Sequence, residues 1–127
     1  MCAQSVRVTI VAASAETLDG LQGYLSRAGV GATGSRELAA AHASPCSAVV
    51  VFPDDFSPDE VMRELGRLRR ERPNAVPLLV TGEPERYLRV AQVEGRGRAP
   101  VVMPRPAWGW MILDAIRDVT TFDEDGE

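Results

Sequence analysis

One apolar run, residues 47–52 with the sequence Ser-Ala-Val-Val-Val-Phe, stops abruptly at Pro53 and the acids Asp54 and Asp55. Consecutive β-branched and aromatic residues bounded by proline and acids are typical of a strand buried on both faces of a parallel sheet. Because open α/β folds place their chemistry at the carboxyl ends of such strands, the residues after this run are the first candidates for a site. The run ends on Phe52, whose side chain can neither attack an electrophile nor bind a cation through oxygen.

The composition indicates one domain and argues against several classes of function. With 127 residues, the chain can bury roughly two-thirds of its unfolded surface. Its net charge of −4 argues against a nucleic-acid-binding surface, which usually needs a basic stripe. Residues 1–5 carry no basic region, and the apolar stretch after them is interrupted by Arg7 and Thr9, so we expect neither a signal peptide nor a membrane span and predict a cytoplasmic protein. Cys2 and Cys46 lack zinc-site spacing and are expected to be reduced thiols.

Strands and helices alternate along the chain. Ser14 is expected to cap a first helix, and Ser57-Pro58-Asp59-Glu60 is a capping box with proline at the first helical position. The predicted strands cover residues 6–12, 30–33, 47–52, 76–81 and 100–103. The predicted helices cover residues 15–28, 35–42, 58–72 and 108–119, with a weaker helix after Pro84. We assign residues 1–120 to the domain and expect the acidic tail, 121–127, to fray.

This alternation predicts a doubly wound α/β domain, with a five-stranded parallel sheet of order 2-1-3-4-5 and helices on both faces. The ligand crevice of such a fold lies beside the carboxyl ends of the first, third, fourth and fifth strands. The residues that reach this crevice are Ala12, Ala13 and Ser14, then Phe52 to Asp55, then Thr81 and Gly82, then Arg105 and Pro106.

These strand ends carry a resemblance to the response-regulator receiver domains of two-component signalling, a family with the flavodoxin-like fold. Ile10–Leu18 is similar to the segment in which that family has an acidic pair, and Val49–Phe52 is similar to the strand that ends at its phosphorylated aspartate. Leu79–Gly82 resembles the fourth strand with its switch threonine, and Met103–Pro106 resembles the lysine-proline element after the fifth strand. The resemblance covers nearly the whole chain and implies a signalling domain.

The chain departs from the family at the residues that carry its chemistry. In the family, two acids and the acceptor aspartate hold Mg²⁺, and the aspartate attacks a phosphoryl donor. Ala12 and Ala13 offer no side-chain oxygen, and Phe52 removes both a ligand and the nucleophile. The degenerate phosphorylation site therefore consists of Ala12, Ala13, Phe52, Thr81 and Arg105, the last in place of lysine. We expect a pseudo-receiver with no metal, no cofactor and no enzymatic activity.

Two features of the crevice leave alternatives open. Asp54 and Asp55 either restore phosphorylation or metal binding from a shifted position or form a solvated loop, and the lack of further acids favours the loop. Arg105 either binds an anion together with Thr81 or forms an ion pair with Asp54 or Asp55. The crevice around Arg105, Thr81 and Ser14 therefore supports an alternative function, the sensing of a small anion or nucleotide.

Aromatic residues late in the chain point to a surface that binds protein. Trp108 and Trp110 are two residues apart at the start of the last helix, so both cannot face the core. They are either exposed anchors or partly buried against the loop after the fourth strand. In the receiver family, the surface built from helix 4, strand 5 and helix 5 is the usual docking and dimerisation surface. By that resemblance we expect a protein partner or a second copy, with no nucleic acid or membrane, to bind Tyr87, Val102, Trp108, Trp110 and Met111.

Overall fold

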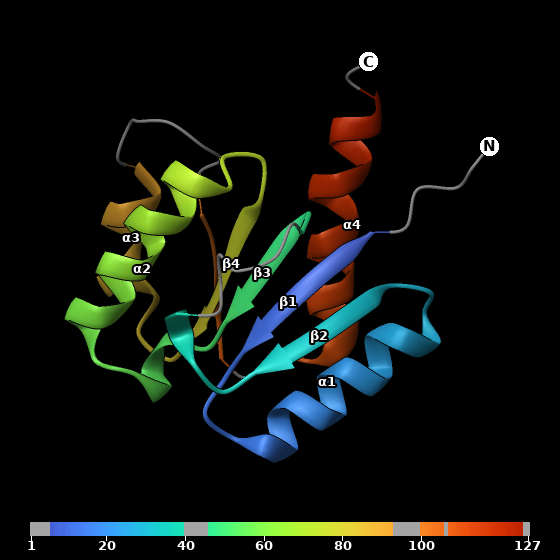
Figure 1. Ribbon diagram of the computed structural model, residues 1–127, viewed down its shortest axis with the longest axis horizontal. Helices are drawn as coiled ribbons and strands as arrows, with labels where there is room; N and C mark the ends of the chain where they lie inside the picture. Colours follow the sequence, from blue (N-terminus) through green and yellow to red (C-terminus); the bar gives the residue numbers. More distant parts are fainter. Residues whose placement is uncertain (1–5, 40–45, 93–99, 106, 126–127) are drawn as a thin grey trace.

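The computed structural model describes residues 6–39, 46–92, 100–105 and 107–125 (Figure 1). Its strands are β1 (Arg7–Val11), β2 (Gly31–Ser35), β3 (Ala48–Val51), β4 (Val76–Thr81) and β5 (Val101–Pro104). Its helices are α1 (Ala15–Arg27), α2 (Pro58–Glu71), α3 (Pro84–Gln92) and α4 (Gly109–Asp125), with a short 3-10 helix, η2 (Pro53–Asp55), after β3. The strands pair in parallel in the order β2-β1-β3-β4-β5, which confirms the predicted topology.

The helices form two layers around the sheet, with α1 and α4 on one face and α2 and α3 on the other (Figure 1). The central strand β3 is buried on both faces, because the side chains of successive residues alternate between the two layers. Val50 packs in the cluster beneath α1 and α4, whereas Val49 and Val51 pack in the cluster beneath α2 and α3. The uninterrupted apolar run of the sequence is therefore explained by two cores that share one strand.

The predicted helix starts are confirmed by their hydrogen bonds. The Ser14 hydroxyl accepts from the Thr17 N–H at 3.3 Å, and the Ser57 hydroxyl accepts from the Glu60 N–H at 3.2 Å. These side chains satisfy backbone donors that have no partner inside the helix, and thereby fix where α1 and α2 begin. Both helices start just after strand ends, so the caps also set the positions of the loops that form the candidate site.

Two predicted segments differ in the structure. The helix expected over residues 35–42 is not formed at its start, because Ser35 belongs to β2 and pairs with Val11. The Ser35 hydroxyl also accepts from the Glu37 N–H at 3.1 Å, a local turn that competes with helix formation. Residues 36–39 contain no α-helix, and residues 40–42 lie outside the described residues.

The second difference lies at the end of the chain. Helix α4 continues to Asp125, so the acidic tail that we expected to fray from residue 121 is helical over most of its length. The sequence contains no glycine or proline between Val119 and Gly126, and nothing there stops helix propagation. None of the helices in the described ranges combines the length and apolar character needed to cross a membrane.

Of the two cysteines, Cys2 lies outside the described residues. Cys46, just before β3, is a free thiol, as predicted. Burial raises the pKa of the Cys46 thiol, against smaller opposing effects of a hydrogen bond with Thr9 and the charge of Arg72. The thiol is therefore less ionised than an exposed cysteine at neutral pH.

Candidate functional site

The loops after β1, β3, β4 and β5 meet at one edge of the sheet, where the sequence places the crevice. The Phe52 N–H donates to the Val11 carbonyl at 3.0 Å, and the Arg105 N–H donates to the Thr81 carbonyl at 3.0 Å. These backbone bonds continue the sheet pairing by one step past the strand ends. The side chains of the four loops are thereby brought within reach of one another.

Asp54 is the centre of this cluster. The Thr81 hydroxyl donates to its Oδ1 at 2.6 Å, and the Gly82 N–H donates to its Oδ2 at 2.7 Å. Nη1 of Arg105 lies 3.7 Å from the same Oδ2. The carboxylate thus connects the loop after β3 to the loops after β4 and β5.

The pKa of Asp54 reflects these contacts. Partial burial by itself would raise the pKa of this carboxyl. The hydrogen bonds from Gly82 and Thr81 outweigh that effect, together with the nearby positive charges of Arg105 and Arg86, so the pKa of Asp54 lies below its ordinary value. Asp54 is therefore a permanent negative charge at neutral pH.

Asp55 connects the same loop to the end of β1. Its Oδ2 accepts from the Ala13 N–H at 2.9 Å, and the Ala13 carbonyl accepts from Nε of Arg36 at 2.9 Å. Both aspartates are exposed, but each binds a neighbouring loop, which corrects the expectation that they form only a solvated connection. Where the resemblance places an acidic pair, the chain instead has a backbone N–H bound by Asp55.

Where the resemblance places an acceptor aspartate, this chain has the aromatic ring of Phe52. Phe52 is 8% exposed and packs in the cluster beneath α1 and α4. Val80 and Ile112 belong to the same cluster, so the ring is part of the core on that side of the sheet. No oxygen reaches this position from Phe52, Ala12 or Ala13.

The donor set does not fit Mg²⁺, the ion that the fold family implies. Magnesium requires near-octahedral oxygen coordination. In their described residues these loops contribute three carboxylates, Asp54, Asp55 and Glu83. Oxygens of the two aspartates accept hydrogen bonds, the guanidinium of Arg105 lies next to Asp54, and Glu83 forms an ion pair with Arg86 at 3.0 Å. Within the described ranges, no three His, Cys, Asp or Glu residues are grouped so that they could hold a metal ion.

Of the two alternatives for Arg105, the structure contains the ion pair. The partner of Arg105 is Asp54 rather than Asp55. At 3.7 Å, with side chains 46% and 28% exposed, this pair is partly screened by solvent and adds little stability. The positive charge of Arg105 partly balances the negative charge of Asp54.

The predicted binding face does not form one surface. Tyr87 is only 2% exposed and packs beneath α2 and α3, with Val102 partly buried against the same cluster. Met111 packs partly against the opposite cluster, beneath α1 and α4. The reason is the alternation along β5, in which Val101 and Met103 face one layer and Val102 faces the other. Tyr87 is therefore a core residue, and burial raises the pKa of its phenol.

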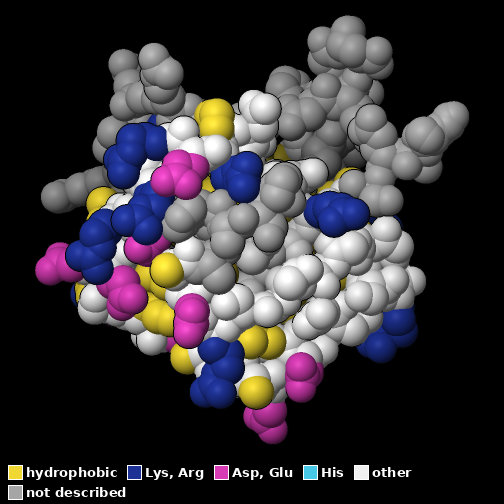
Figure 2. Space-filling view, viewed as in Figure 1, with side chains coloured by type: hydrophobic (Ala, Val, Ile, Leu, Met, Phe, Trp, Pro, Cys, Tyr) yellow, Lys and Arg dark blue, Asp and Glu magenta, His cyan; other side chains and the backbone are white. Residues whose placement is uncertain are grey.

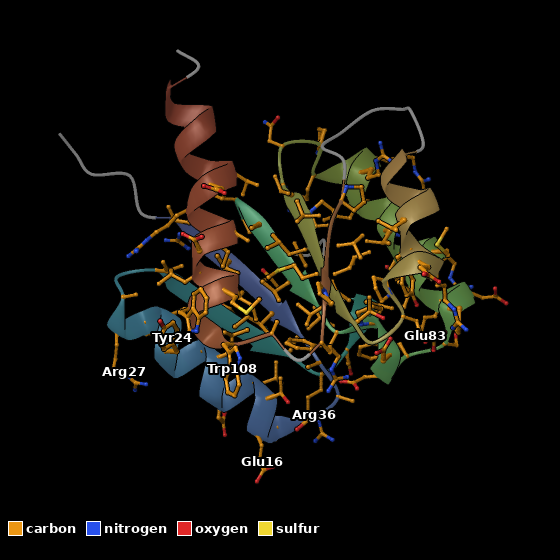
Figure 3. The ribbon with its side chains drawn as sticks, turned by 180° about the vertical axis from the view of Figure 1, so that it is seen from behind. Glu16, Tyr24, Arg27, Arg36, Glu83 and Trp108 are labelled. Atoms are coloured by element: carbon orange, nitrogen blue, oxygen red, sulfur yellow. The ribbon has the colours of Figure 1, made fainter. Side chains whose placement is uncertain are left out.

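Trp108 and Trp110 are 63% and 62% exposed, as the anchor interpretation requires, but they lie beside α1. They line a groove of about 510 Å³ between α1 and the start of α4, whose floor includes Phe52. Figure 3 shows Trp108 next to Tyr24 of α1, with Glu16 and Arg27 towards the two ends of that helix.

Sequence reasoning missed this groove. A Cβ on Gly109 would lie 3.0 Å from the Tyr24 ring, so a larger residue at this position would require the ring to move by a few tenths of an ångström. A Cβ on Gly20, in contrast, would meet nothing within 4 Å. The available signals were Gly109 between the two tryptophans and Gly20 within a predicted helix, but sequence alone does not reveal which elements the glycines bring together.

Comparisons with known proteins agree on the fold. No protein-family model matches the sequence, and no curated protein matches it. Among solved structures, the chain is similar to a CheY-like response regulator receiver domain protein from Methanospirillum hungatei, at 16% identity and a TM-score of 0.77, covering 98% of this chain and 100% of that one.

Two further structures show the same architecture. The receiver domain of an HD domain-containing protein from Pseudomonas fluorescens is 19% identical with a TM-score of 0.73, covering 99% of this chain and 94% of that one. A structure of an adenylate cyclase from Rhodopirellula baltica is 22% identical with a TM-score of 0.68, covering 96% of each chain. At these identities the likeness establishes that the chain has the receiver-domain fold, and nothing finer.

Proposed function

We propose that this chain is a pseudo-receiver, a non-enzymatic signalling module that acts by binding protein and does not depend on Mg²⁺-dependent aspartyl phosphorylation. The observation that carries the proposal is the combination of a phenyl ring at the acceptor position with a carboxylate, Asp54, already bound to Thr81 and Gly82. An acyl phosphate requires a carboxylate nucleophile and a metal to neutralise the incoming charge. Neither requirement is met by Phe52, Ala12 and Ala13.

In this proposal the Asp54 carboxylate takes the place of a phosphoryl group. It is the negative charge that faces Thr81, the residue at the position of the switch threonine. The Thr81 hydroxyl donates to Asp54 and accepts from the Glu83 N–H at 2.9 Å, so its orientation is fixed on both sides. The loop after β4 is then held in one arrangement without any modification. Changes of state would come from a partner with unequal affinity for two conformations.

The alternative, sensing of a small anion or nucleotide, has less support. The three groups that would bind the anion are already engaged within the chain. The Thr81 hydroxyl and Arg105 contact Asp54, and the Ser14 hydroxyl caps α1. A ligand would have to displace Asp54 from Thr81 and Arg105, and to compete with the Thr17 N–H for the Ser14 hydroxyl.

The proposal is tested by incubating the purified chain with Mg²⁺ and a small phosphodonor such as acetyl phosphate, followed by intact-mass spectrometry. We expect no added phosphate, while a receiver with an intact acidic site gains one under the same conditions. A stoichiometric phosphate on this chain, mapped to Asp54 or Asp55, would overturn the proposal.

A further inference from the structure

The groove between α1 and α4 is bordered by the most exposed large apolar side chains in the described part of the chain, Trp108 and Trp110. Met62 and Leu88, the next most exposed, lie on α2 and α3. Two solvent-exposed indoles that border one groove are typical of the anchors that dominate binding between proteins. The groove therefore has the character of a docking surface. Its other wall, on α1, indicates which kind of partner fits it.

That wall belongs to one side of α1, which we call the α1 stripe: the exposed residues Glu16, Gly20 and Arg27, and the half-buried Gly23. The spacing of four, three and four residues places all of them on one face of the helix. Glu16, Gly20 and Arg27 also line the groove. A Cβ on Gly20 would meet nothing within 4 Å, and one on Gly23 would meet only Nη1 of Arg27, at 3.5 Å, the flexible end of a side chain. The backbone in the middle of the stripe is therefore open to close approach at Gly20, and at Gly23 once the Arg27 side chain moves aside.

The ends of the stripe carry opposite charges. Glu16 and Arg27 are separated by about 16 Å along the helix axis, at 1.5 Å per residue. Figure 2 shows acidic side chains near the start of α1, with basic ones beside them, basic side chains near its end, and a mostly uncharged surface between. A helix with this pattern attracts a second helix that has the same pattern and runs antiparallel to it, because the acid of each helix then lies beside the base of the other.

The stripe is complementary to itself. The point midway between Gly20 and Gly23 is also midway between Glu16 and Arg27. One two-fold axis through this point therefore sets Glu16 of each copy beside Arg27 of the other, and Gly20 of each copy opposite Gly23 of the other.

We propose that the partner of this surface is a second copy of the chain, with the two α1 helices packed antiparallel along their stripes and the tryptophans covered at the flank. This inference rests on the proposed function and gives it a partner. An unrelated protein would need its own matched pattern of charge and small residues, whereas a second copy supplies both by symmetry.

The association is tested by sedimentation of the full chain from about 1 µM to about 1 mM, a range that covers weak to moderate affinity. We expect a reversible monomer–dimer equilibrium. Glu16→Arg or Arg27→Glu alone should weaken it about tenfold or more, because each places like charges together at both ends. The double variant Glu16→Arg/Arg27→Glu should restore the native affinity, which only an antiparallel pairing of identical helices predicts.

Two further variants locate the interface. Trp110→Ala should weaken the dimer about tenfold or more, as expected for an interface anchor. Arg63→Glu, an exposed charge reversal on α2, serves as the matched control and should leave the dimer unchanged. Circular dichroism confirms that each variant is folded, which we expect because all four positions are on the surface.

Three results would overturn the inference: a monomer at every concentration, a double variant no tighter than the single ones, or a dimer insensitive to Trp110→Ala. A monomer would leave the groove to a different protein, and it would not affect the proposed function, which fails only if the chain accepts phosphate. The two failures therefore have separate readouts.

Discussion

Asp54 places negative charge where donors from two other loops converge. Thr81 and Gly82 would each lose an acceptor without it, and the Thr81 hydroxyl is buried. A buried donor without an acceptor is costly, because its hydration is not replaced. The carboxylate is therefore expected to stabilise the fold as well as to fix the loop.

Asp54→Ala should lower the free energy of unfolding by about 1–3 kcal/mol, the usual cost of leaving a buried polar group without its partner. Urea denaturation followed by circular dichroism measures this. Asp114→Asn, an exposed acid on α4, is the matched control and should change stability by less than about 0.5 kcal/mol. Equal stability of the Asp54 variant and this control would contradict the assigned role.

The same carboxylate should make stability depend on pH in a definite direction. Because the pKa of Asp54 is lower in the folded chain than in the unfolded chain, the unfolded chain binds the proton more readily at acidic pH. Its contribution is complete above the ordinary aspartate pKa of about 4 and is lost as pH falls through the lower folded value. Asp54→Asn should flatten this part of the stability–pH curve; a curve with the native slope would contradict the assignment.

Two glycines beside the groove, Gly109 and Gly20, have different surroundings. Gly109 lets the start of α4 approach the Tyr24 ring, whereas Gly20 leaves open space on the surface of α1. The two glycines therefore have opposite consequences when a methyl group is added.

Gly109→Ala should destabilise the fold by about 1–3 kcal/mol, since its Cβ would enter the Tyr24 ring contact at 3.0 Å. Gly20→Ala should stabilise the fold by about 0.5–1 kcal/mol, because alanine has less conformational entropy to lose in a helix. Thermal unfolding of both variants at one protein concentration measures the difference. A Gly109→Ala variant as stable as Gly20→Ala would show that the two helices do not approach as described.

Element boundaries were predictable where local chemistry decides them. The caps at Ser14 and Ser57 and the uninterrupted run of β3 carry their own signals, and the structure confirms them. The helix start predicted at Ser35 was wrong because Ser35 pairs with Val11 as the last residue of β2. Such pairing depends on residues far apart in the sequence and leaves no mark in a local pattern.

The sheet order and the crevice were also predictable, because short right-handed connections leave few topologies for alternating strands and helices. The contacts within the crevice were predictable only as alternatives. Sequence could not choose Asp54 over Asp55 as the partner of Arg105, or assign Asp55 to the backbone of Ala13. Sequence could not show that Tyr87 is buried or that the tryptophans lie beside α1, since both are tertiary effects.

At the scale of the whole molecule, we propose that this receiver fold has no site for a metal and a phosphoryl group. The most direct measurement is a titration of the ¹⁵N-labelled chain with Mg²⁺ and then beryllofluoride, a phosphoryl mimic, followed by NMR. The amides of Ala13 and Gly82 report on the crevice, because they donate to Asp55 and Asp54. We predict that neither resonance moves. Saturable shifts of both amides at stoichiometric ligand would contradict the claim.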